Sequence, residues 1–536
     1  MPRGLGGVER GAPPSTSASW TRRYTPERTS LAAAALGAIT VAGFAPFYLY
    51  PVPVLTLALL LWLCGRSPSP KRAGALGWWF GLGFFLTGVS WVYVSLHDFG
   101  AMPAPLAAFA TLIFCAYLAL FPALTGYAYR ALGGSAGWKL ALWVPAVWTA
   151  AEWTRGWLFT GFPWIAAGYS QIPSSPLAGY APVLGVYGVT FTVLASAGLL
   201  VALAGHLSAR ASAHAENPQR ARLRLQGLVA HPALIVLVVI WAGGYGLKSV
   251  TWTDPIGAPT TVALLQGNIA QDIKWTEEGL RTTFATYRSL ALASKAKLTI
   301  FPETALPIFL RDVPGDYLGA LADHARHNGG DVLIGVPERL PDESYYNSVI
   351  SIGTAPIQAY RKTHLVPFGE FIPLRPVLGW IVSVLAIPLQ DFSRGNPDAK
   401  PLAVAGQRVA MNICYEDAFG EEIIRQLPAA TLLANVSNVA WFGRSIAPQQ
   451  HLQISQARAL ETGRYMLRAT NTGMTAIVNE RGVVVQAAPQ FATATVTGSV
   501  QGFSGSTPYV RWGNAPIIGA CLLLIVAALT WSRMRR

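Results

Sequence analysis

Charged residues are scarce in this sequence. Asp, Glu, Lys and Arg make up 12% of its 536 residues, whereas 52% of the residues are hydrophobic and the mean hydropathy is +0.37. An average soluble protein carries about 25% charged residues. The shortage therefore argues against a soluble protein and favours a polytopic membrane protein.

The usual signals of bound metal, nucleotide and nucleic acid are also missing. The four cysteines and eight histidines show no zinc-type spacing. The sequence contains no glycine-rich phosphate loop, no internal repeat and no clustered basic stripe that would read a nucleic acid. We therefore expect no metal site, no organic cofactor and no nucleic-acid partner.

Long apolar segments are what the sequence has instead, and they predict an α-helical bundle with about eight transmembrane helices. Seven belong to a predicted membrane domain at residues 29–250, and the eighth lies in residues 512–536, which end in a cytoplasmic tail. Residues 1–28, rich in Gly, Pro, Ser, Thr and Arg, are predicted to form a mobile cytoplasmic tail. The predicted spans are residues 30–47, 51–64, 74–96, 104–130, 138–158, 178–204, 228–248 and 514–532.

The placement of Lys and Arg predicts the topology. These residues cluster in the N-terminal tail, in every second loop and at the C-terminus, and the other loops nearly lack them. Because Lys and Arg accumulate on the cytoplasmic side, seven spans from a cytoplasmic N-terminus place the region after residue 250 outside. The same placement explains the net charge of +14 and the pI near 9.7. The clusters are Arg22, Arg23 and Arg28; Arg66, Lys71 and Arg72; Arg130 and Lys139; Arg210, Arg220, Arg222 and Arg224; and Arg533, Arg535 and Arg536.

Residues 258–507 have the pattern of a soluble α/β domain. Short apolar strands, such as TVALLQ, LTIFPE and VAMNIC, alternate with helix-like stretches at 277–293, 316–327 and 448–467. This alternation is typical of stacked layers of sheet and helix. Residues 474–488 are predicted to form a hairpin that turns at 480–482.

Cys414 is the only thiol in this domain, because Cys64, Cys115 and Cys521 lie in predicted spans. It ends the strand-like stretch VAMNIC, and a turn then leads into the helix-like stretch DAFGEEIIRQL. A corner between strand and helix can expose a thiol to neighbouring side chains and backbone N–H groups. The alternative is that Cys414 is simply a small, buried hydrophobic side chain, as most free cysteines are.

Glu303 and Lys362 are candidates to complete a site around this thiol. Glu303 follows the strand LTIFP, and Lys362 lies in YRKTHLVPFGE. A carboxylate beside a thiol can take its proton, and an ammonium can stabilise a thiolate and the oxyanion of a tetrahedral intermediate. Taken singly, Glu303 also fits an acid at a helix start, and Lys362 a solvated lysine. The prediction therefore requires a fold that brings them together.

The stretches FPETALP, YRKTHLVPFGE and NICYE resemble the nitrilase superfamily, as do SNVAWFG and RATNTG. In the membrane part, SWVYVSLHDFG and EWTRGWLFTGFPWIAAGYS extend the resemblance to the apolipoprotein N-acyltransferase family of bacteria. The resemblance implies a nitrilase-like αββα sandwich at 258–507, joined to a helical membrane bundle. It also implies the bacterial inner membrane, with the catalytic domain on the periplasmic side.

The resemblance assigns roles to the three reactive groups. Glu303 would be the general base, Lys362 the partner of the oxyanion and the thiolate, and Cys414 the nucleophile. Glu370, in PFGE, matches the second glutamate of the superfamily, which orients the lysine and the attacking amine.

Other positions match the family with less specificity. Tyr415 and Glu416 match positions implicated in activity, although Glu416 also fits a solvated residue at a helix start. Trp441 and Phe442, in AWFG, look like part of a mobile arm for an acyl chain, and ordinary core aromatics are the alternative. Residues 373–392 include Trp380, and the apolar core of this stretch is too short to span. They are expected to form a lid that dips into the membrane or a helix packed on the sheet.

The resemblance implies a two-step acyl transfer. An acyl chain would pass from the sn-1 position of a phospholipid to a cysteine thioester and then to the α-amine of the diacylglyceryl cysteine of an apolipoprotein, which is the last step of lipoprotein maturation. Two alternatives remain open. One is a membrane-tethered amidase that hydrolyses a water-soluble amide, and the other is a transporter or scaffold whose outer domain merely binds a ligand.

Overall fold

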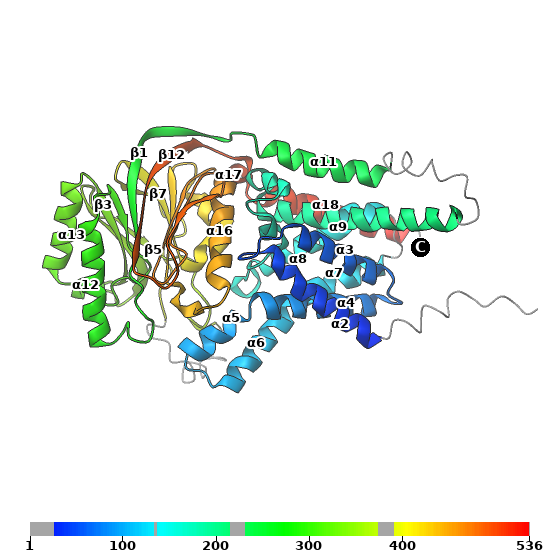
Figure 1. Cartoon of the computed structure of the whole chain (residues 1–536), viewed down its shortest axis with the longest axis horizontal. Helices are drawn as coiled ribbons and strands as arrows, with labels where there is room; N and C mark the ends of the chain where they lie inside the picture. Colours follow the sequence, from blue (N-terminus) through cyan, green and yellow to red (C-terminus); the bar gives the residue numbers. More distant parts are fainter. Residues whose placement is uncertain (1–25, 133–136, 215–230, 374–390, 535–536) are drawn as a thin grey trace, which may run out of the picture.

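The computed structural model describes residues 26–132, 137–214, 231–373 and 391–534. Figure 1 shows two regions that lie end to end, a bundle of helices and a domain with two β-sheets. The start of α2 (Pro26–Thr40) and the end of α18 (Ala515–Met534) both lie at the end of the bundle that is remote from the sheets (Figure 1). Both ends of the bundle's chain therefore lie on the side away from the sheet domain.

Each predicted span contains a helix. Apolar residues form these helices, and Pro and Gly residues lie near many of their ends. Several helices begin at a Pro, because Pro is favourable at the first helical position and unfavourable further in. The principal helices of the bundle are α2 (Pro26–Thr40), α3 (Pro51–Gly65), α4 (Pro70–Gly88), α5 (Trp91–Val94), α6 (Ala104–Leu118), α7 (Leu120–Ala131), α8 (Val144–Arg155), α9 (Ala181–His214), α11 (Pro232–Leu247) and α18 (Ala515–Met534).

Not every one of these helices is long enough to cross a bilayer alone. Among the described residues, three helical segments are sufficiently long and apolar, at Ala104–Ala131, Pro176–Ser208 and Ala515–Met534. The segments Pro70–Gly88 and Trp91–Phe99 meet at a bend of 49° and together would make a fourth. Helices α3 and α11 are apolar but contain only 15 and 16 residues. The number of eight spans therefore stays a prediction.

The outer faces of the bundle are apolar. Large hydrophobic side chains of α6, α11 and α18 are exposed, and a contiguous face of this kind is unfavourable in water. Contact with lipid tails would not carry this unfavourable free energy, so the bundle has the apolar surface expected of a membrane domain. Examples of these exposed side chains are Phe109, Ile113, Val238, Val239, Leu523 and Val526.

The second region contains two six-stranded sheets. In the first sheet the strand order is β12 (Ala494–Gly505), β1 (Thr253–Gln266), β2 (Leu298–Ile300), β3 (Asp331–Arg339), β4 (Tyr345–Gly353) and β5 (Ala359–Arg361). In the second sheet it is β11 (Val484–Ala487), β10 (Ala476–Val478), β9 (Met466–Thr470), β8 (Leu432–Ser437), β7 (Gln407–Ile413) and β6 (Leu402–Val404). Strands β1, β2 and β3 are parallel, as are β7, β8 and β9.

The two sheets pack face to face over an apolar core, and helices cover their outer faces. Helices α12 (Glu277–Ala293) and α13 (Gly315–His327) pack on the first sheet through residues such as Tyr287 and Leu321. Helix α16 (Ala447–Thr462) packs on the second sheet through residues such as Leu452. The predicted αββα order is therefore confirmed.

The predicted hairpin is also confirmed, because β10 and β11 are antiparallel neighbours. The predicted helix at 448–467 was too long at its C-terminal end. Helix α16 ends at Thr462, because Gly463 adopts a left-handed conformation with φ of 62° and residues Met466–Thr470 then form β9.

Candidate active site

Cys414 lies at a sharp corner directly after β7. Its φ of 55° is in the left-handed region, which is rare for a residue with a Cβ and is characteristic of functional corners. The chain continues from this corner into a short 3₁₀ turn, Cys414–Ala418. Cys414 is half-buried, and none of the four cysteines is in a disulfide. The predicted corner between strand and helix is therefore present.

Glu416 ties this corner to the segment that follows Lys362. One carboxylate oxygen accepts hydrogen bonds from the backbone N–H groups of Thr363 at 2.6 Å and His364 at 3.0 Å. The other accepts from the Ile413 N–H at 2.7 Å and the Tyr360 hydroxyl at 2.9 Å. With 2% of its surface exposed, Glu416 is a buried anchor, so its reading as a solvated residue was wrong.

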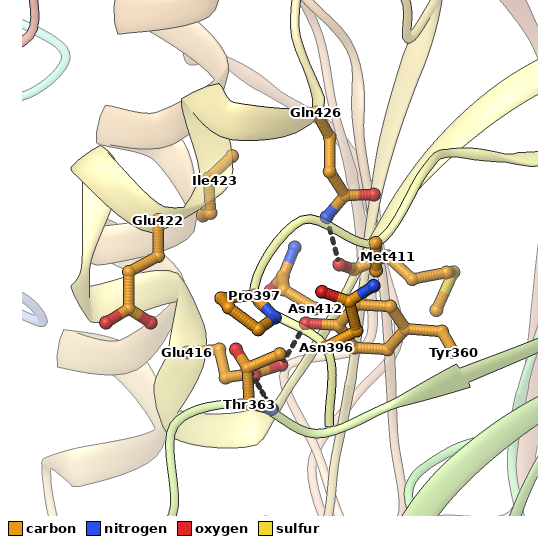
Figure 2. Close-up of a pocket in the computed structure, with 11 residues that line it drawn as sticks. Tyr360, Thr363, Asn396, Pro397, Met411, Asn412, Glu416, Glu422, Ile423 and Gln426 are labelled. Atoms are coloured by element: carbon orange, nitrogen blue, oxygen red, sulfur yellow. Dashed lines mark hydrogen bonds between the residues drawn. The ribbon is translucent and has the colours of Figure 1, made fainter. Parts of the chain in front are cut away.

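A small pocket lies beside this anchor (Figure 2). Its lining includes Tyr360, Thr363 and Glu416, whose hydrogen bonds to one another are drawn in Figure 2. The residues that line it do not include Glu303, Lys362 or Cys414. The pocket therefore belongs to the support of the corner and is not where those three groups meet.

Glu303 follows β2 and is held by two donors. The Asn347 side chain donates to one carboxylate oxygen at 2.8 Å, and the backbone N–H of Asn438 donates to the other at 2.7 Å. Asn347 lies on β4, and Asn438 directly follows β8 of the opposite sheet. The carboxylate is therefore fixed between the two sheets.

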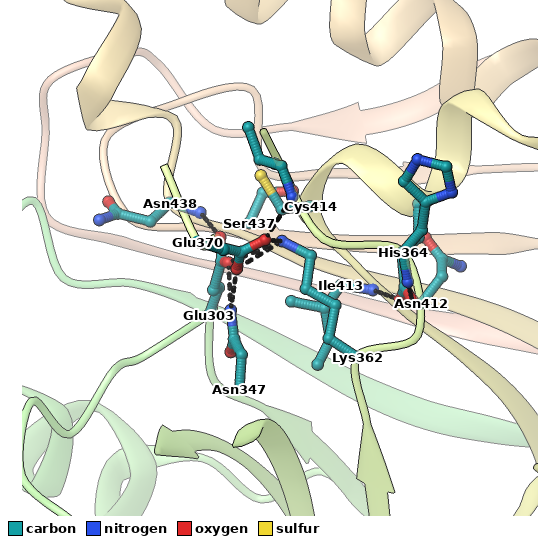
Figure 3. Close-up of polar contacts among 12 residues, drawn as sticks. Glu303, Asn347, Lys362, His364, Glu370, Asn412, Ile413, Cys414, Ser437 and Asn438 are labelled. Atoms are coloured by element: carbon teal, nitrogen blue, oxygen red, sulfur yellow. Dashed lines mark hydrogen bonds and ion pairs between the residues drawn. The ribbon is translucent and has the colours of Figure 1, made fainter. Parts of the chain in front are cut away.

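Lys362 directly follows β5 and is 1% exposed. Its ammonium group lies 2.9 Å from Glu370 and 3.6 Å from Glu303. The Asn347 side chain also donates to Glu370 at 3.1 Å, so one amide contacts both carboxylates. Figure 3 shows Cys414 next to this group of side chains, with the Lys362 ammonium beside both carboxylates. The structure thus brings together the four residues that the sequence analysis singled out.

Charge in this cluster determines the resting state of the thiol. Burial and the carboxylate of Glu303 raise the pKa of the Cys414 thiol well above its ordinary value, and Lys362 opposes that shift. Burial disfavours the charge of Lys362, but Glu370 and Glu303 outweigh this effect and raise the pKa of the lysine. At neutral pH the site therefore holds a protonated thiol beside an ammonium group.

Tyr415 faces the bundle. Its hydroxyl donates to the Gly161 carbonyl at 3.1 Å, and its ring lies against Phe162 and Trp164 with centroid distances of 6.4 and 6.2 Å. Because Tyr415 follows the nucleophile candidate directly, the reactive corner sits against the end of the bundle.

Trp441 and Phe442 also contact the bundle. The Ser95 hydroxyl donates to the Trp441 carbonyl at 2.8 Å, and the Phe442 ring lies 4.8 Å from that of Trp91. Both side chains are half-buried. Their role as an acyl-chain arm stays a prediction. Trp380 and the expected lid at 373–392 lie outside the described residues, apart from the ends of that segment.

Several polar residues of the site were not singled out from the sequence. Asn347 belongs to none of the motifs, and Asn438 lies in SNVAWFG, where the resemblance assigns it no role. The Asn438 side chain donates to Gln271 at 2.9 Å, and Lys274 lies three residues further along the same turn. Lys274 is 2% exposed, and burial lowers its pKa to about 8. A charged residue in a polar loop looks solvated in sequence, so these residues had no distinguishing pattern.

Within the ranges that the structure describes, no group of three or more His, Cys, Asp or Glu side chains could hold a metal ion.

The two sheets, with Cys414, Glu303 and Lys362 converging between them, define a nitrilase-like domain of the carbon–nitrogen hydrolase class. The family model "Carbon-nitrogen hydrolase" matches residues 261–509, and the model "Apolipoprotein N-acyltransferase N-terminal domain" matches residues 36–199. The chain belongs to the apolipoprotein N-acyltransferase family.

Relatives of that name match over nearly the whole chain. A protein of Nitrosomonas europaea is 55% identical over 93% of this chain and 96% of its own length. One of Chromobacterium violaceum is 46% identical over 94% of both chains. One of Ralstonia nicotianae is 44% identical over 94% of this chain and 93% of its own. The similarity thus covers the bundle and the sheet domain together.

Proposed function

We propose that this protein transfers an acyl chain from the sn-1 position of a phospholipid to the α-amine of the diacylglyceryl cysteine of an apolipoprotein, through a thioester on Cys414. The observation that carries the proposal is the convergence of Cys414, Glu303 and Lys362 at an apolar bundle. The names of the relatives supply the class of acceptor.

The first step activates the thiol. Because the pKa of Cys414 is raised, the thiolate forms only as its proton moves to a base, and Glu303 is the adjacent carboxylate whose electrostatic effect on the thiol is the largest. Lys362 retains its proton, because two carboxylates raise its pKa, so it acts as a cation and not as a base. Moving the proton to Glu303 leaves the total charge of the site unchanged.

The thiolate then adds to the ester carbonyl of the phospholipid. The ammonium of Lys362 and a backbone N–H stabilise the resulting oxyanion. The carbon–oxygen bond of the ester breaks, the lysophospholipid leaves with the proton that Glu303 held, and a thioester remains on Cys414.

In the second step the acceptor amine attacks this thioester. Glu303 takes a proton from the amine, the carbon–sulfur bond breaks, and Cys414 regains its proton as the amide forms. Glu370 is a positioning residue in both steps, because it holds Lys362 at 2.9 Å.

The bundle gives both substrates access to the site. Both are lipids, and the residues after Cys414 pack on aromatic side chains of the bundle. The proposal places the bundle in the bacterial inner membrane with the sheet domain on the periplasmic side, as the placement of Lys and Arg predicts.

The test compares Cys414→Ser with Cys521→Ala in the full-length protein, reconstituted in phospholipid vesicles with a diacylglyceryl peptide as acceptor. We expect Cys414→Ser to abolish N-acylation, because a hydroxyl at this corner is a far weaker nucleophile than a thiolate. We expect Cys521→Ala, in α18, to transfer normally. Transfer by Cys414→Ser at the wild-type rate would overturn the proposal, and turnover of water-soluble amides without lipid would favour an amidase.

A further inference from the structure

The carbonyl oxygen of Cys414 has two polar side-chain contacts. It accepts a hydrogen bond from the Asn435 side chain at 3.0 Å and lies 3.2 Å from Nε2 of His451. Asn435 lies on β8, and His451 lies on α16. The two contacts therefore come from the sheet and from the helix that covers it.

His451 belongs to a fully buried polar network. Its Nε2 lies 2.7 Å from one oxygen of Asp417, and the other oxygen of Asp417 accepts from Ser455 at 2.6 Å and from Arg468 at 3.2 Å. Arg468 also donates to Asn435 at 2.7 Å. The network is closed, because both residues that contact the Cys414 carbonyl are tied to each other through Arg468 and Asp417.

The contacts of His451 determine where its proton lies. Two acceptors, the Asp417 carboxylate and the Cys414 carbonyl, surround Nε2, so Nε2 carries the proton and donates to both. The Nδ1 atom is buried without a partner among the described residues, which suits an unprotonated nitrogen. Burial and the charge of Arg468 lower the pKa of His451, so the neutral form is maintained at neutral pH.

Fixing the carbonyl of Cys414 also fixes the next N–H group. The peptide bond between Cys414 and Tyr415 is trans, so its C=O and N–H point in opposite directions within one plane. The hydrogen bonds of the described residues give the Tyr415 N–H no protein acceptor. Cys414 has a positive φ, and a residue with a Cβ keeps such a conformation only where its surroundings hold it.

We propose that His451 and Asp417 are positioning residues that orient the Cys414–Tyr415 peptide so that the Tyr415 N–H donates to the oxyanion formed during acyl transfer. This inference rests on the proposed function. His451 acts through the peptide and does not act as the base of the thiol, since its Nε2 proton is already shared by Asp417 and the carbonyl.

The test replaces His451 with two amides that differ in the position of their donor. In His451→Gln the side-chain amide nitrogen can reach the position of Nε2, whereas in His451→Asn it reaches only the position of Nδ1. Each variant is made in the full-length protein, and two reactions of Cys414 are measured. One is acylation by phospholipid without acceptor, and the other is alkylation by iodoacetamide, located at Cys414 by mass spectrometry.

The two reactions distinguish a loss of the orientation of the Cys414–Tyr415 peptide from general damage to the site. Acylation passes through an oxyanion, whereas alkylation by iodoacetamide displaces iodide and forms none. We expect His451→Asn to slow acylation at least about tenfold, with the phospholipid concentration that gives half the maximal acylation rate unchanged, and to leave alkylation near the wild-type rate. We expect His451→Gln to recover most of the lost rate.

Two results would overturn the inference while leaving the proposed function intact. One is acylation by His451→Asn at the wild-type rate. The other is an equal loss of acylation and alkylation in His451→Asn, which would show damage to the thiol itself. Failure of the wild-type protein to acylate Cys414 would instead count against the proposed function.

Discussion

The two helix layers of the sandwich occupy equivalent positions but have different surroundings. Helix α12, on the first sheet, buries a single stripe and exposes its remaining face. Helix α16, on the second sheet, is buried at every residue except Gln449, because the bundle covers its other side. The same architectural element therefore faces water in one case and a membrane domain in the other. Residues that line the stripe of α12 are Gly279, Thr283, Tyr287 and Ala291.

The difference shows how the sheet domain is attached to the bundle. The buried outer face of α16 is polar, and its side chains hydrogen-bond across the interface. Gln453 accepts from the Ala45 N–H at 3.0 Å and donates to the Ile172 carbonyl at 2.9 Å. Glu461 accepts from the Val186 N–H at 2.7 Å. Directional bonds of this kind fix the position of the corner at Cys414 relative to the bundle.

The largest effect is expected for the buried ion pair of α16. Arg458 lies 3.1 Å from Glu461, and both are almost completely buried. Arg458→Met leaves the Glu461 carboxylate without its cation, which should lower the free energy of unfolding by about 3–5 kcal/mol. The measurement is thermal unfolding in detergent. The double variant Arg458→Met/Glu461→Leu should recover most of this loss, and a double variant less stable than the single one would contradict the account.

Lys274 is a buried lysine just before α12, and removing its charge is expected to raise the stability of the protein. Burial lowers the pKa of Lys274 from 10.5 to about 8, so between these values the unfolded state binds more protons than the folded state. Stability should therefore rise with pH from about 8 to 10.5, and at neutral pH the charge should cost about 3 kcal/mol. Lys274→Met should raise the unfolding midpoint at pH 7 and abolish the rise. The exposed Lys297→Met is the control, and a destabilised Lys274→Met at pH 7 would refute this reasoning.

A smaller effect is expected for Gln450 of α16. Its side-chain oxygen accepts from the indole N–H groups of Trp164 at 2.7 Å and Trp91 at 3.3 Å. Gln450→Ala leaves these buried donors unpaired, which should cost about 1–3 kcal/mol in unfolding experiments. Gln449→Ala, at the one residue of α16 that is not buried, should cost less. Equal losses from the two neighbours would remove the distinction between the faces of this helix.

The smallest effect is expected on the water-facing layer. Arg326 and Asp323 form an ion pair at 2.7 Å on α13, and both side chains are more than half exposed. Solvent weakens such a pair, so Arg326→Ala should change the free energy of unfolding by less than about 1 kcal/mol. A loss as large as that of Arg458→Met would mean that burial does not determine how much an ion pair contributes to the free energy of unfolding.

The water-facing layer could be predicted from the sequence, and the bundle-facing layer only in part. The predicted helix at 277–293 has the observed bounds, because Thr276 caps it and apolar or small residues recur every four positions. The strands β2 and β7 and the residues that follow them were also predicted. These features depend on local periodicity and on capping, which a single sequence shows.

Features that depend on distant contacts could not be predicted. The contact between Asp417 and His451 joins residues 34 positions apart, and the contact between Asp417 and Arg468 joins residues 51 positions apart. The first contact arises only when α16 packs on the second sheet, and the second only when β7, β8 and β9 pair within that sheet. The bend between Pro70–Gly88 and Trp91–Phe99 was likewise hidden, because apolar composition continues through it.

The central claim is that Cys414 carries the acyl chain between the two substrates. The most direct measurement incubates the full-length protein with a phospholipid that bears a palmitoyl chain at sn-1, without acceptor, and determines the mass of the Cys414 peptide. The account predicts a palmitoyl adduct that hydroxylamine removes, that a diacylglyceryl peptide discharges, and that Glu303→Gln forms much more slowly. Transfer to the acceptor without any such adduct on Cys414 would contradict it.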